Sequence, residues 1–60
     1  MKKYVLRITK TKNVFYGECD NFLEYGEGLT KDECITDFLY RVNKENKTDI
    51  EEKELLIINL

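Results

Sequence analysis

The side chains of this 60-residue chain that could do chemistry are its carboxylates and two cysteines, because the sequence contains no histidine. Histidine is the commonest general base and the usual partner of a serine or cysteine nucleophile. A two-metal nuclease needs clustered carboxylates, including one within its first strand, yet residues 3–10 hold no acid. Two cysteines without histidine do not make a zinc site or a disulfide framework. We therefore predict that the protein is not an enzyme and has no catalytic residues, metal or cofactor.

Both cysteines have a simpler structural interpretation than reactivity. Cys34 lies near the start of an expected helix, where a thiol pKa can be lowered, but it also falls on the apolar stripe of that helix. Neither thiol has a histidine that could activate it. We expect Cys34 to pack in the core, and Cys19 and Cys34 to stay reduced, as is usual in the cytosol.

Charge is distributed unevenly along the chain, although the net charge is only −2. Residues 1–13 hold five cations and no acid, whereas residues 14–40 hold seven acids and one lysine. Five cations on one strand and its turn are better explained as a solvated strand edge than as a nucleic-acid site. The acidic segment is either a docking face for a basic partner or a scattered solvated surface, and the sequence leaves both alternatives open.

Aromatic residues are frequent for so short a chain, and exposed tyrosines are typical anchors of protein interfaces. Tyr16 and Tyr40 fall at positions that we expect to be exposed. Base stacking on the strand that bears Tyr16 is disfavoured, because Glu18 on the same strand repels phosphate. From charge and expected exposure we select the candidate partner-binding residues Tyr16, Glu18, Asp20, Glu24 and Glu27.

Three strands are predicted in the first half of the chain. Residues 3–10 alternate at period two and are rich in β-branched and aromatic residues, which favours a strand. Residues 14–19 form the second strand, joined to the first by the polar turn 11–13. Residues 22–26 are predicted as a third, shorter strand, after which the glycine-rich segment 26–29 breaks the chain.

A helix and a final strand are predicted in the second half. Thr30 and Glu33 have the spacing of a capping box, in which each side chain accepts from the other residue's backbone N–H. The helix is expected over residues 31–45, because apolar residues then recur at helical spacing. These stripe residues are Cys34, Ile35, Phe38, Leu39 and Val42. Residues 54–60 are nearly all apolar and are predicted as a strand.

These elements predict a single small α+β domain over residues 1–60, with the order β-β-β-α-β. Short turns give an antiparallel three-stranded meander, and the crossover helix returns the last strand parallel to the first, so the sheet order is 3-2-1-4. One face of the sheet lies under the helix and the other stays open. The open face is expected to carry Val5, Arg7, Tyr16 and Glu18. Free edges of such a sheet favour homodimerisation.

The helix start Gly28-Leu29-Thr30-Lys31-Asp32-Glu33-Cys34-Ile35, in this element order, resembles the HicB antitoxin family. The strand running into Cys19-Asp20 resembles the aromatic-rich strand and Pro-Asp turn of that family, although this chain has no proline. The resemblance implies a partial ribonuclease H-like fold over residues 3–60. The DNA-binding segment common in the family has no counterpart here, so we expect the toxin-binding module alone.

The resemblance implies a non-enzymatic inhibitor that neutralises a small basic ribonuclease toxin by covering its active site. The alternative is a stand-alone phage-encoded inhibitor of a bacterial defence system, similar to an anti-CRISPR protein, and the third hypothesis is a small nucleic-acid-binding module. No signal peptide or membrane span is expected, because the longest apolar run is four residues. We therefore expect a cytoplasmic bacterial or phage protein without membrane association.

Overall fold

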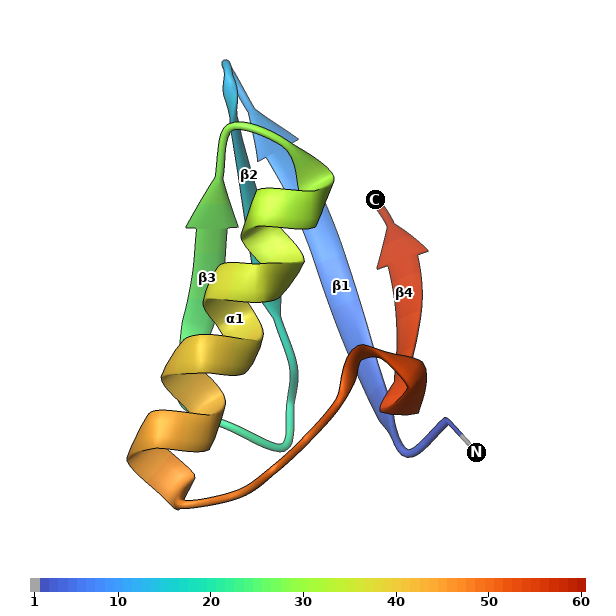
Figure 1. Cartoon of the computed structure of the whole chain (residues 1–60). Helices are drawn as coiled ribbons and strands as arrows, with labels where there is room; N and C mark the ends of the chain where they lie inside the picture. Colours follow the sequence, from blue (N-terminus) through green and yellow to red (C-terminus); the bar gives the residue numbers. More distant parts are fainter. Residues whose placement is uncertain (1) are drawn as a thin grey trace.

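Four strands and one long helix account for most of residues 2–60, the part of the chain that the structure, a computed structural model, describes (Figure 1). The elements are β1 (Tyr4–Thr11), β2 (Val14–Glu18), β3 (Tyr25–Gly28), α1 (Lys31–Asn46), the short 3-10 helix η1 (Glu52–Glu54) and β4 (Leu55–Asn59). This is the predicted α+β order β-β-β-α-β. No helix within residues 2–60 has the length and apolar composition needed to span a membrane.

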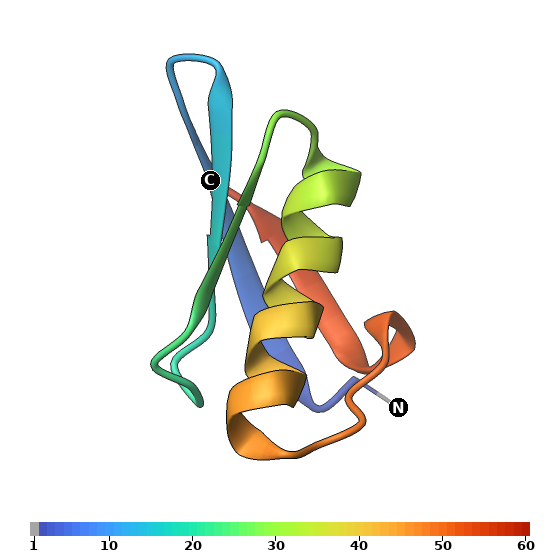
Figure 2. The same cartoon turned by 60° about the vertical axis from the view of Figure 1, so that its left-hand side comes forward.

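The four strands form one sheet in the predicted order β3-β2-β1-β4. β1 pairs with β2 antiparallel, with Arg7 opposite Glu18, and with β4 parallel, with Val5 opposite Leu56. β3 pairs antiparallel with the other side of β2. Helix α1 lies along one face of this sheet, as the view in Figure 2 shows.

The third strand begins later than predicted, at Tyr25 instead of residue 22, and it includes the glycines that were expected to break the chain. The physical reason is the close approach of α1. A Cβ atom on Gly26 would lie 2.5 Å from the Cys34 carbonyl oxygen and the Phe38 nitrogen, so only glycine fits there. Phe22 lies outside the sheet and packs its ring against Phe38, at 6.4 Å between centroids.

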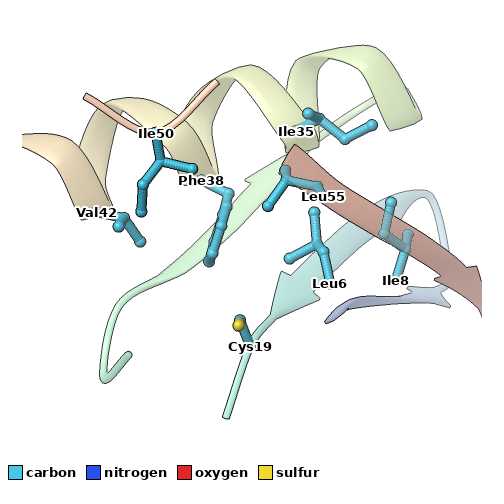
Figure 3. Close-up of a cluster of buried hydrophobic side chains, with 8 residues drawn as sticks. All are labelled: Leu6, Ile8, Cys19, Ile35, Phe38, Val42, Ile50 and Leu55. Atoms are coloured by element: carbon cyan, nitrogen blue, oxygen red, sulfur yellow. The ribbon is translucent and has the colours of Figure 1, made fainter. Parts of the chain in front are cut away.

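The core lies between α1 and the covered face of the sheet (Figure 3). Its fully buried large side chains come from β1, α1 and β4, and include Leu6, Ile8, Phe38, Val42 and Leu55. Cys19 and Cys34 are buried free thiols, as predicted for Cys34. Burial raises the pKa of the Cys34 thiol, and the charges of Asp37 and Glu27 add to this effect.

Helix α1 begins and ends within one residue of the prediction. The Thr30 hydroxyl accepts a hydrogen bond from the Glu33 N–H at 3.1 Å, as expected for an N-cap. The reciprocal half of the capping box differs, because the Glu33 carboxylate accepts from the Leu29 N–H at 2.9 Å instead of from Thr30. The helix ends at Asn46 and is capped by Lys47, which adopts the left-handed conformation with φ of 55° and donates its N–H to the Asn43 carbonyl.

Candidate functional site

The face of the sheet opposite α1, here called the open face, is the candidate functional site. It carries the side chains that alternate with the buried ones: Val5, Arg7, Thr9, Tyr16, Glu18, Tyr25, Glu27, Leu56 and Ile58. This confirms the predicted positions of Val5, Arg7, Tyr16 and Glu18. The β1–β4 half of the face is mainly apolar, whereas the β2–β3 half carries tyrosines and carboxylates.

Tyr16 and Tyr25 form the centre of the β2–β3 half. The strand register places Tyr16 opposite Glu27 and Tyr25 opposite Glu18, so each ring has a carboxylate directly across the strands. The two ring centroids are 6.4 Å apart, and the side chains of Tyr16 and Tyr25 remain 39% and 47% exposed. With neighbouring residues of β1 and β2 they line a shallow hollow of about 260 Å³.

Arg7 links two of the candidate acids on one side of the tyrosines. Its guanidinium lies 2.8 Å from the Asp20 carboxylate and 3.5 Å from that of Glu18. The hydrogen bond to Arg7 lowers the pKa of Asp20, and the same contact raises the pKa of Arg7. Glu18 and Asp20 are therefore partly neutralised, and a basic partner has to compete with Arg7 for them.

Arg41 of α1 borders the tyrosines on the other side, at the edge of β3. Its Nε lies 3.1 Å from Asp37, a terminal nitrogen lies 4.0 Å from Glu27, and the guanidinium stands 5.3 Å from the centre of the Tyr25 ring. Partial burial by itself would lower the pKa of Arg41, but the charge of Asp37 and the contact with Tyr25 raise it overall. A positively charged Arg41 thus orients both Glu27 and the Tyr25 ring.

The structure brings together four of the five predicted contact residues. Tyr16, Glu18 and Glu27 lie on the open face, and Asp20 joins them through Arg7. Glu24 lies elsewhere, because its carboxylate accepts a hydrogen bond at 2.9 Å from Asn46 at the end of α1.

Tyr25 and Arg41 also belong to the site, although neither was among the residues predicted from the sequence. The signal for Tyr25 was the Tyr25–Gly28 alternation, in which the two glycines face the helix and Tyr25 faces away. Tyr40 is exposed as predicted, at 63%, but it lies on α1 beside Lys44, away from the open face.

A second hollow, of about 310 Å³, lies on the helix side of the sheet near the start of α1. It is lined by Ile8, Lys10, Phe15, Lys31, Asn59 and Leu60. Two lysines beside an aromatic ring resemble a single-stranded nucleic-acid site. The Lys10 ammonium, however, already stands 5.5 Å from the centre of the Phe15 ring and covers a face on which a base would stack.

No family model matches the chain, and neither a curated protein nor a solved structure matches it. The resemblance to the HicB family therefore depends on the element order, on the helix start and on the strand that runs into Cys19-Asp20. The residues at the helix start have a structural role in this fold: a Cβ on Gly28 would come within 2.6 Å of the Cys34 nitrogen, and Thr30 caps α1.

Proposed function

We propose that this chain is a non-enzymatic binding protein that inhibits a basic protein partner by covering it. The observation that carries the proposal is the pair Tyr16 and Tyr25 on the open face, each with a carboxylate directly across the strands. Tyrosines at the centre of an interface contribute large, rigid contact area, and surrounding charges steer the partner and set its orientation. The resemblance to HicB antitoxins suggests a small basic ribonuclease toxin as the partner.

The arginines on either side of the tyrosines support this function. Arg7 lies within 3.5 Å of Glu18 and Asp20, and Arg41 lies 4.0 Å from Glu27, so each carboxylate has an arginine beside it before a partner arrives. Ion pairs between exposed side chains are weak, so replacing them costs a partner little. A basic partner whose cations match the spacing of the carboxylates can displace the arginines. A small mobile cation cannot contact several carboxylates at once and so gains little binding free energy, which favours a specific basic protein as the partner.

A ribonuclease assay tests the proposal directly. The probe is the purified product of a small basic ribonuclease gene adjacent to the gene for this chain, and we expect added chain to abolish RNA cleavage at an equimolar ratio. Without such a gene, or with a ribonuclease that stays active at excess chain, the toxin assignment is wrong. The alternative partner is then a protein of a bacterial defence system, and substitution of Tyr16 or Tyr25 should weaken its inhibition by this chain.

Paired tyrosine substitutions identify the binding face. We expect Tyr16→Ala and Tyr25→Ala each to weaken binding about thirtyfold, which corresponds to about 2 kcal/mol for an interface anchor. Tyr40→Ala is the matched control, because Tyr40 is exposed but lies on α1. Calorimetric titration measures the three dissociation constants. Equal losses for Tyr16→Ala and Tyr40→Ala would show that the open face is not the binding surface.

A further inference from the structure

The two edges of the sheet differ in how their backbone groups are satisfied. At the β3 edge, the outward Glu27 N–H donates to the Asp37 carboxylate of α1 at 2.9 Å. The Arg41 guanidinium packs on the Tyr25 ring at the same edge. Helix α1 thus closes the β3 edge with side chains and blocks the approach of another strand.

The β4 edge is covered only at its start, where the Leu55 N–H donates to the Glu52 carbonyl of η1. The Leu60 N–H donates to the Ile8 carbonyl of β1 at 2.8 Å, and strand alternation therefore directs the N–H groups of Leu56 and Ile58 toward β1 as well. The intervening residues Ile57 and Asn59 direct theirs away from the sheet, where no further strand of the described chain lies. In Figure 1 the short helix η1 lies beside the start of β4, and the outer side of the rest of the strand is free.

The composition of β4 lacks the features that usually protect an edge strand. Residues 55–60 contain no charged side chain and no proline, although natural edges commonly carry lysine, proline or a bulge to prevent pairing. Beside this edge the open face exposes Val5, Leu56 and Ile58, at 38%, 46% and 39%. Ile57, on the helix side, is only partly buried. The strand therefore offers both backbone hydrogen bonds and apolar side chains on its two faces.

We propose that β4 pairs antiparallel with β4 of a second copy of this chain, about a two-fold axis at Ile57, to form one continuous sheet. In this register Ile57 lies opposite Ile57 of the second copy, and Leu55 lies opposite Asn59. The outward N–H and carbonyl groups of Ile57 then exchange hydrogen bonds in an antiparallel pair, and the Asn59 N–H donates to the Leu55 carbonyl of the second copy. The Leu55 N–H takes no part, because it already donates to the Glu52 carbonyl of η1. Leu56 lies opposite Ile58 on the open face, so the two apolar patches merge.

Charge favours a second copy as the occupant of this edge. The two-fold register sets apolar residues opposite apolar residues, and Glu54, the nearest acid, falls opposite Leu60. No side chains of like charge meet, so the side chains of this edge are complementary to themselves, as an isologous interface requires. An interface made by one five-residue strand from each copy buries little surface, below about 1,200 Å² in total. We therefore expect a reversible dimer whose population depends on protein concentration.

The dimer does not depend on the proposed function, because the tyrosines of the open face lie on β2 and β3, at the far side of the sheet from β4. Each dimer would present two such tyrosine pairs. Loss of partner binding and loss of dimerisation are therefore separable by variants at different strands.

Sedimentation equilibrium over a wide concentration range tests the dimer. We expect wild type to show a monomer–dimer equilibrium, and Ile58→Glu to remain monomeric because it buries a carboxylate against the apolar Leu56 of the second copy. Leu23→Glu is the matched control, since Leu23 is a leucine exposed at 98% and remote from β4, and it should dimerise as wild type does. Wild type that stays monomeric throughout, or an Ile58→Glu variant that still dimerises, overturns the proposal.

Amide hydrogen exchange on the wild-type protein gives a second measurement that needs no variant. The Ile57 and Asn59 amides should exchange more slowly as concentration rises, whereas the Glu27 amide, already bonded to Asp37, should be unaffected. A dimer in which the Ile57 and Asn59 amides exchange at unchanged rates would place the interface elsewhere.

Discussion

Gly26 and Gly28 lie where the backbone of α1 rests directly on β3. None of the glycines in residues 2–60 has a positive φ, so their backbone conformation does not require glycine. The requirement is space. A Cβ on Gly26 would meet backbone atoms of α1 at 2.5 Å, whereas a Cβ on Gly17 would meet the Cys34 sulfur at 3.0 Å. A side-chain sulfur can move more easily than a helix backbone, so the two positions should respond differently to the same substitution.

We expect Gly26→Ala to lower the free energy of unfolding by about 3 kcal/mol, at the upper end for overpacking, because the helix must shift off the sheet. Gly17→Ala should cost about 1 kcal/mol, since small side-chain adjustments relieve the contact. Urea denaturation of both variants provides the comparison. Similar losses for the two would mean that α1 does not pack as closely on β3 as the structure indicates.

The connection from α1 to β4 is held by one side chain, Asn43. Its amide nitrogen donates to the Ile50 carbonyl at 3.0 Å, and its amide oxygen accepts from the Ile50 N–H at 2.9 Å. The same oxygen accepts from the Thr48 hydroxyl at 2.8 Å. The Asn43 amide therefore bonds both backbone polar groups of Ile50, as a neighbouring strand would. This lets the Ile50 side chain lie in the core although Ile50 is in no helix or strand.

Asn43→Ala should lower the free energy of unfolding by about 2 kcal/mol, because it leaves the backbone groups of a buried residue without partners. Asn46→Ala is the matched control, since Asn46 is an exposed asparagine on the last turn of the same helix. We expect it to cost less than about 1 kcal/mol. Hydrogen exchange at the Ile50 amide should accelerate only in the Asn43 variant, and unchanged exchange there would contradict the anchoring role.

Across the whole molecule, charges that are segregated in the sequence become interleaved in space. Cations near the start of the chain pair with acids from distant segments, as in Arg7 with Asp20 at 2.8 Å and Lys3 with Glu54 at 3.4 Å. A hydrogen bond from the Glu51 N–H lowers the pKa of Glu54, and Lys3 lowers it further. The local field on the open face is therefore weaker than the acidic segment 14–40 suggests.

The carboxyl groups of Asp20 and Glu54 should make the stability of the fold depend on pH. The folded-state pKa values of Asp20 and Glu54 lie below their unfolded values. Both groups therefore stabilise the fold fully at pH values above the unfolded pKa of about 4. Their contribution is lost as pH falls through the folded pKa, because the unfolded state binds the proton more readily. Urea denaturation at a series of pH values should show a shallower loss in acid for Glu54→Gln than for wild type. Parallel curves for the two proteins would contradict this role of Glu54.

Local patterns in the sequence were sufficient to predict β1, β2, α1 and β4. Each of these elements has a clear apolar pattern, and Thr30 provides a recognisable helix cap. Short connections and the handedness of the crossover then determined the strand order β3-β2-β1-β4. Alternation along β1 and β2 also placed Val5, Arg7, Tyr16 and Glu18 on the open face. All of these follow from interactions between near neighbours in the chain or from general rules of connection.

The tertiary structure alone decided the rest, because the interactions concerned join residues distant in sequence. The glycines of β3 have no local preference for a strand, and only the approach of α1 explains them. The positions of Tyr25 and Glu27 follow from that strand, and Arg41 reaches them from the helix. Likewise, only the position of Asp37 beside Glu27 distinguishes the closed edge at β3 from the open edge at β4.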